Sequence, residues 1–108
     1  MPWNLPDTVD ALRAQIEALR AKNQAVLAEF LSTEIELGFT LLQTAKIEAD
    51  SDRDHARSAL TVAKEALSSL RRFENRIEDS SASADLQSRA DQLESAIAAF
   101  SRIYFRLG

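Results

Sequence analysis

The sequence predicts an all-α fold, and three observations carry that prediction. The 108 residues include only two glycines and two prolines, so few positions interrupt a helix. Alanine, leucine, arginine and glutamate are abundant, and these residues are strong helix formers. β-branched residues never alternate with polar ones over the length of a strand. A chain of this length accommodates one domain, and we expect three helices within it.

The first predicted helix is unusually long and covers residues 6–49. Asn4 can cap it, Pro6 is tolerated in its first turn, and Trp3 can fold back as a hydrophobic staple. At ~1.5 Å per residue this helix would extend roughly 65 Å. Gly38 lies inside it and predicts either a bend or a close approach of the second helix.

A short acidic turn, residues 49–52, separates the first helix from a second one at about 52–78. Ser51 and Asp54 have the spacing of a capping box, which predicts Ser51 as the N-cap. The apolar residues on both sides of the turn recur at helical spacing, so the two helices should pack as antiparallel neighbours. These residues are Phe30, Leu31, Ile35, Leu41, Leu42 and Ala45 before the turn, and Ala56, Leu60, Ala63, Leu67, Leu70 and Ile77 after it.

The polar stretch 79–83 predicts a linker, with Ser83 as the cap of a third helix at about 83–107. Short connections between three helices predict an up-down-up antiparallel bundle with an extra-long first helix. The apolar positions of the third helix are Leu86, Ala90, Leu93, Ile97, Phe100, Tyr104 and Leu107. Alanine supplies much of the apolar content, so the core should be thin, and its expected members are Leu60, Leu67, Leu70, Leu93, Ile97 and Phe100.

The first part of the long helix carries a heptad pattern typical of a coiled coil. The a positions are Val9, Ile16, Asn23, Phe30 and Leu37, and the d positions are Leu5, Leu12, Leu19, Val26 and Thr33. We call this stripe the heptad seam.

A length mismatch predicts that part of this seam is exposed. A second helix of about 25 residues reaches back only to residues 21–24, so the segment 6–20 should project beyond the bundle. A bare apolar stripe of this kind indicates a binding surface for another protein chain. The predicted contact residues are Val9, Leu12, Ile16, Leu19, Asn23 and Val26.

Charges beside the seam favour an antiparallel pair or packing against the acidic side of another helix. Arg13, Arg20 and Lys22 occupy e and g positions, where basic residues oppose a symmetric parallel pair. Asn23 is either a buried amide that fixes the register or a solvated residue where the seam frays. The opposite side of the helix is either a solvent-exposed face or a second close-packing surface, and it carries Ala11, Ala14, Ala18, Ala21, Ala25 and Ala28.

The sequence offers little for catalysis or for a cofactor. It has no cysteine, and its single histidine, His55, is expected in a surface or capping role at the start of the second helix. Asp50, Asp52 and Asp54 alternate as at the start of an EF-hand loop, but the glycine and glutamate positions of that loop are His55 and Thr61. We therefore expect a protein that is not an enzyme and that holds neither a metal nor a cofactor.

The central hairpin carries a recognisable pattern of small and apolar residues. These residues are Glu36, Leu37, Gly38 and Leu41 in the first helix and Ala59, Ala63, Ala66 and Leu67 in the second. In this pattern the hairpin resembles a single tetratricopeptide-type repeat. The three-helix shape also resembles the microtubule-interacting-and-trafficking bundles. Both families bind helical or extended peptides in grooves between helices, so the resemblance implies a protein-interaction module.

Charge and hydropathy indicate the environment of the protein. The net charge is −4 with both signs interspersed, which argues against a nucleic-acid-binding surface. Arg71, Arg72 and Arg76 are interleaved with glutamates and predict a solvated face. The chain starts without the basic and apolar regions of a signal peptide, and no apolar run approaches the ~18 residues of a membrane span, so a cytoplasmic location is expected.

The sequence thus favours a small non-catalytic protein that forms a homodimer, or binds another protein, through its long first helix. A nucleic-acid-associated accessory protein is the alternative.

Overall fold

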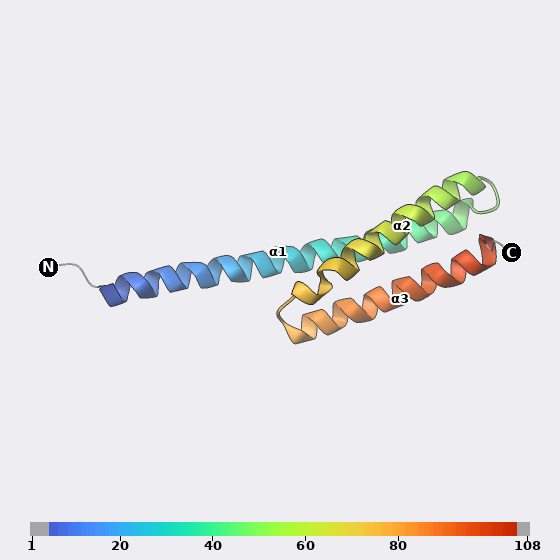
Figure 1. Ribbon diagram of the computed structural model, residues 1–108. Coiled ribbons are helices and arrows are strands. Elements are labelled where there is room, and N and C mark those ends of the chain that lie inside the picture. The colour runs from blue at the N-terminus through green and yellow to red at the C-terminus, as the bar shows by residue number, and fades with distance from the viewer. Residues whose placement is uncertain (1–4, 106–108) are drawn as a thin grey trace.

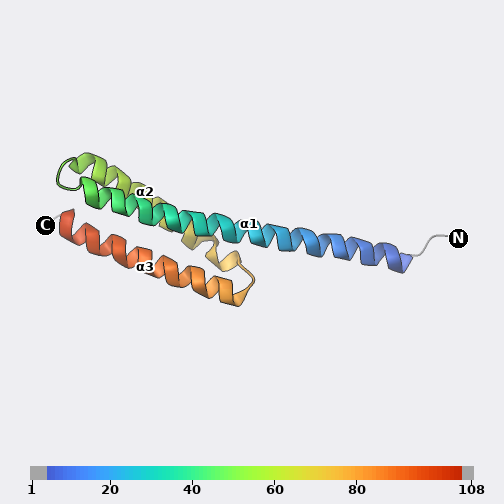
Figure 2. The same ribbon diagram turned by 180° about the vertical axis from the view of Figure 1, so that it is seen from behind.

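Three α-helices joined by short connections make up the part of the chain that the structure describes (Figure 1). The computed structural model describes the backbone of residues 5–105 and the side chains of residues 9–105. α1 is Leu5–Glu48, α2 is Arg53–Phe73 followed by the 3₁₀ turn η1 at Glu74–Arg76, and α3 is Ser80–Tyr104. α2 returns antiparallel to α1, and α3 runs beside them in the direction of α1 (Figures 1 and 2). The predicted up-down-up bundle with a long first helix is confirmed.

The molecule is strongly elongated. Its principal extents are 78 × 22 × 18 Å, and its Cα radius of gyration is 20.7 Å, against roughly 13 Å for a compact domain of this length. α1 has 44 residues whereas α2 has 21, so α1 projects well past the far end of the hairpin (Figure 2). Within residues 5–105, no helix combines the length and the apolar content that crossing a membrane requires.

α1 continues through Gly38, where α3 comes close. A Cβ atom at this position would lie 2.5 Å from Cδ2 of Leu93, so glycine lets the Leu93 side chain pack directly on the backbone of α1. The sequence left two roles open for Gly38, a bend or a close approach of the second helix. Gly38 does allow a close approach, but the helix that approaches is the third one.

Aspartates cap both later helices, and the two serine caps predicted from the sequence are wrong. The Asp52 carboxylate accepts a hydrogen bond of 3.0 Å from the His55 backbone N–H at the start of α2. The Asp79 carboxylate accepts one of 2.8 Å from the Ala82 backbone N–H at the start of α3. A carboxylate at the N-cap also interacts favourably with the positive end of the helix dipole, which a serine hydroxyl does less strongly.

The connection between α2 and α3 differs from the expected one. Ile77 has extended backbone (φ −73°, ψ 121°) and a buried side chain, so α2 ends before the predicted residue 78. With Asp79 as the cap, the serine-rich stretch predicted as a linker, residues 79–83, is mostly the first turn of α3. The expected roles of Trp3, Asn4 and Leu107 lie outside the described residues.

The core is thin and has two parts. The part near the α1–α2 turn is built around Leu42, Leu60, Leu93, Ile97 and Phe100. The other part is built around Leu31, Ile35, Leu70, Ile77 and Leu86. Five of the six predicted core residues are buried, and the sixth, Leu67, is partly buried and packs against both parts. The buried alanines that bring the helices close together are Ala45, Ala49, Ala56, Ala59, Ala63, Ala66 and Ala90.

Arg71 ties α2 to α3. Its Nη2 donates to Asp91 Oδ1 at 2.6 Å, and its Nη1 lies 3.3 Å from Glu74 Oε1. The hydrogen bond to Asp91 raises the pKa of the Arg71 guanidinium above its ordinary value. The predicted solvated face is therefore wrong for this residue, whose side chain is 29% exposed and bridges two helices.

Replacing Gly38 with alanine should lower the stability of the fold. Overpacking against Leu93 costs about 1–3 kcal/mol, whereas the gain in helix propensity is ~1 kcal/mol. Urea denaturation should therefore give a lower free energy of unfolding for Gly38→Ala.

Leu93→Ala supplies the matched background for this test. Leu93 is fully buried, so its truncation alone should cost ~2–5 kcal/mol. Once the leucine is removed, Gly38→Ala should raise the free energy of unfolding. An equal loss in both backgrounds would show that Leu93 does not exclude a side chain at position 38.

Candidate functional site

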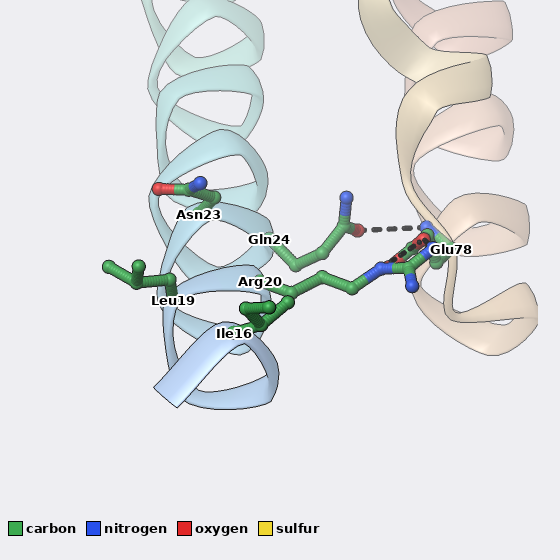
Figure 3. Close-up of a pocket in the computed structure, with 6 residues that line it drawn as sticks. All are labelled: Ile16, Leu19, Arg20, Asn23, Gln24 and Glu78. Carbon is green, nitrogen blue, oxygen red and sulfur yellow. Dashed lines mark hydrogen bonds and ion pairs between the residues drawn. The ribbon is translucent and has the colours of Figure 1, made fainter. Parts of the chain in front are cut away.

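The bundle ends where the α2–α3 connection meets α1. Gln24 Nε2 donates to the Arg76 carbonyl oxygen at 3.0 Å, and Gln24 Oε1 accepts from the Glu78 backbone N–H at 2.8 Å. One turn earlier, Arg20 Nη2 donates to Glu78 Oε2 at 2.6 Å (Figure 3). These contacts confirm that the hairpin reaches back to about residues 21–24. We call residues 5–19 of α1, which precede them, the arm.

The two kinds of contact act differently. The hydrogen bond and the charge of Glu78 raise the pKa of the Arg20 guanidinium, but both side chains are largely exposed, so water and salt screen the pair. Gln24 instead satisfies one donor and one acceptor of the backbone where α2 has already ended. Together they mark which side of α1 faces the α2–α3 connection, and the buried Leu31 and Ile35 of α1 face the bundle further along the helix.

This orientation of α1 turns Leu19 and Asn23 of the heptad seam away from the connection, whereas Ile16 lies beside Arg20 (Figure 3). In Figure 3, Arg20 and Gln24 point toward Glu78, whereas Leu19 and Asn23 point to the other side of α1. Every residue from Val9 to Asn23 is exposed. The exposed fractions of the predicted apolar contact residues are 44% for Val9, 53% for Leu12, 62% for Ile16, 60% for Leu19 and 57% for Val26.

The exposed seam does not stop where the arm joins the bundle. Phe30 and Leu37 remain 43% and 42% exposed although α2 and α3 cover other sides of α1 at this level. Phe30 was also assigned to the core stripe from its spacing; that assignment is wrong, because its neighbour Leu31 fills the core with no exposed surface. The apolar seam therefore extends from Val9 to Leu37, over the arm and the bundle alike.

A shallow groove lies at the base of the arm. It encloses about 470 Å³ and is lined by Ile16, Leu19, Arg20, Asn23, Gln24 and Glu78. Its lining joins the seam to the charged contacts of the α2–α3 connection. A helix that docks on the seam would thus meet apolar side chains first and charged ones at its edge.

The alanine stripe on the far side of α1 is solvent-exposed along the arm. Ala11, Ala14, Ala18 and Ala21 are exposed, whereas Ala28 is partly buried and packs against the core. Within this chain, the stripe contacts neighbouring helices only where the bundle begins.

A small polar cluster lies at the opposite end of the molecule, at the α1–α2 turn. Potential ligand atoms of Glu48, Asp52 and His55 lie within 4.8 Å of one another. The Asp52 carboxylate is occupied as the N-cap of α2, and Glu48 Oε1 lies 3.9 Å from His55 Nδ1. His55 is exposed in the first turn of α2, as expected from the sequence. The sequence pattern did not place Glu48 in this cluster, because Glu48 belongs to the preceding helix α1.

Comparisons with protein-family models, with curated proteins and with solved structures find no match for this chain. The resemblance of the hairpin to a tetratricopeptide-type unit or to a microtubule-interacting-and-trafficking bundle therefore stays a prediction. The exposed heptad seam and the groove at the base of the arm are the surface features of this chain that indicate a function.

Gln24→Ala should loosen the junction between the arm and the bundle. The substitution removes two hydrogen bonds to the backbone, so the free energy of unfolding should fall by about 1 kcal/mol. Gln15→Ala, on the exposed arm, is the matched control and should change it by less than about 0.5 kcal/mol. Chemical denaturation of both variants measures the difference, and equal effects would mean that Gln24 does not hold the junction.

Proposed function

We propose that this protein is a non-catalytic interaction module that self-associates through the heptad seam of α1. One observation carries this proposal: the apolar residues of the seam are regularly spaced from Val9 to Leu37 and are roughly half exposed. A monomer would leave this continuous stripe in water, whereas a second helix laid along it would cover it.

The arm gives a further reason to expect a partner. It has no neighbouring helix among the described residues 5–105, and helices in proteins gain most of their stability from packing of an apolar face. Fully covering a side chain such as Leu12 or Ile16 contributes ~1.5–3 kcal/mol. Two copies supply eight such residues from their arms (Val9, Leu12, Ile16 and Leu19 in each), which is of the order needed to offset an association cost of about 4–15 kcal/mol.

A nucleic-acid-associated role remains the alternative, with less support. The net charge is −4, and the Arg20 and Arg71 guanidinium groups are paired with carboxylates. Phosphate binding depends on basic groups that gather on one face. The apolar seam instead fits a protein helix.

Leu12→Glu combined with Ile16→Glu should give a monomer whose bundle is still folded. Both side chains lie on the arm, outside the two parts of the core, so the substitutions place charge on the seam without disturbing the packing of α2 and α3. Sedimentation at micromolar concentration should show a dimer or larger assembly for the unaltered protein and a monomer for the variant.

Ala14→Glu combined with Ala18→Glu is the matched control, because it adds the same charge to the opposite side of the same exposed segment. This variant should sediment like the unaltered protein. A monomeric unaltered protein at micromolar concentration would rule out self-association and would leave the seam to a foreign partner.

A further inference from the structure

We infer that the second copy binds antiparallel to α1 in one register, which places Leu12 opposite Leu37 and Leu19 opposite Phe30 of the second copy. This inference rests on the proposed self-association and specifies its geometry. In this arrangement the arm of each copy packs on the part of the seam that lies on the bundle of the other copy. Both exposed parts of the seam are then covered.

The apolar layers fit this register. In an antiparallel pair of helices, an a residue of one helix shares a layer with a d residue of the other. Leu12 then meets Leu37, Ile16 meets Thr33, and Leu19 meets Phe30 of the second copy. Two-fold symmetry repeats each layer at the other end of the interface. The partner's arm would thus cover Phe30 and Leu37, which the bundle leaves 43% and 42% exposed.

The charges beside the seam fit the same register. In an antiparallel pair, e residues face e residues and g residues face g residues across the interface. Arg13 then faces Glu34, and Lys22 faces Glu29 of the second copy, so symmetry gives four pairs of opposite charge. Arg20 faces Leu27, which leaves its guanidinium on Glu78 of its own chain.

The neighbouring registers place like charges together. A shift of one heptad that pairs Leu12 with Phe30 of the second copy would set Arg20 against Arg20 and Lys22 against Lys22. The opposite shift, which pairs Leu19 with Leu37, would set Glu29 against Glu29.

That second shift would also pair Arg20 with Glu34 and Lys22 with Glu36 of the second copy, which are opposite charges. It still keeps the contact of Glu29 with Glu29, and its Glu34 meets an Arg20 that already binds Glu78 within its own chain. A parallel pair in register would place Glu29 beside Glu34 of the second copy twice. Like charges across a helix pair are unfavourable, so the register that pairs Leu12 with Leu37 is the one free of such conflicts along the seam.

Asn23 acquires a role in this arrangement. It shares a layer with Val26 of the second copy, next to the two-fold axis, so the two Asn23 side chains lie in adjacent central layers. This position lies inside the interface, so the proposed arrangement favours the buried amide over the solvated residue, the two roles that the sequence left open for Asn23.

Disulfide trapping tests the register directly, because the chain has no cysteine of its own. Thr33→Cys serves as a fixed reporter, since it removes no large apolar side chain. It is mixed in turn with Val9→Cys, Ile16→Cys or Asn23→Cys, which lie one heptad apart. A disulfide needs Cα atoms within about 7 Å, so each mixture reports one antiparallel register and Thr33→Cys alone reports the parallel pair.

The expected result is a mixed disulfide between Ile16→Cys and Thr33→Cys, formed at least about tenfold faster than in the other mixtures and identified by its intact mass. A dominant disulfide in another mixture, or in Thr33→Cys alone, would overturn the register while self-association stands. A dimer in sedimentation without any of these disulfides would overturn it equally. A monomer without disulfides would instead refute the proposed function on which the register rests.

Discussion

The exposed face of α1 depends on how the α2–α3 connection packs against that helix. Gln24 hydrogen-bonds a backbone carbonyl and a backbone N–H there, Arg20 adds an ion pair to Glu78, and the buried Ile77 follows η1 at the same level. This junction marks where the bundle stops, and together with the buried Leu31 and Ile35 it sets which side of α1 faces the bundle. The exposure of the heptad seam follows from that orientation, because Leu19 and Asn23 point away from the connection (Figure 3).

Because the core is thin, association with a second copy would add apolar burial that the fold itself lacks. Alanines and Gly38 let the helices approach closely, but an elongated molecule with a radius of gyration of 20.7 Å buries less of its surface than a compact one. Arg71 adds polar links between α2 and α3 at the edge of the core. Coverage of the seam by a second copy would add apolar burial where the chain itself provides none.

Patterns within one helix were predicted well from the sequence, and relations between helices were predicted less well. The absence of breakers and the heptad spacing sufficed for α1 and for the exposed arm. The caps were misassigned because serine and aspartate both suit an N-cap and local spacing does not rank them. Phe30 and Leu31 are adjacent and each fits an apolar stripe, so only the packed structure shows that Leu31 enters the core. The contact of Gly38 with Leu93 depends on how α3 is placed, which no local pattern specifies.

Hydrogen exchange of the backbone amides at two protein concentrations tests the central claim most directly, because the arm should be a stable helix only when a second copy covers it. Protection of residues 9–19 should rise as the protein concentration increases through the micromolar range, and it should rise by more than that of residues 86–100, which pack in the core away from the seam. Arm protection that is independent of concentration would contradict the claim that self-association covers the seam.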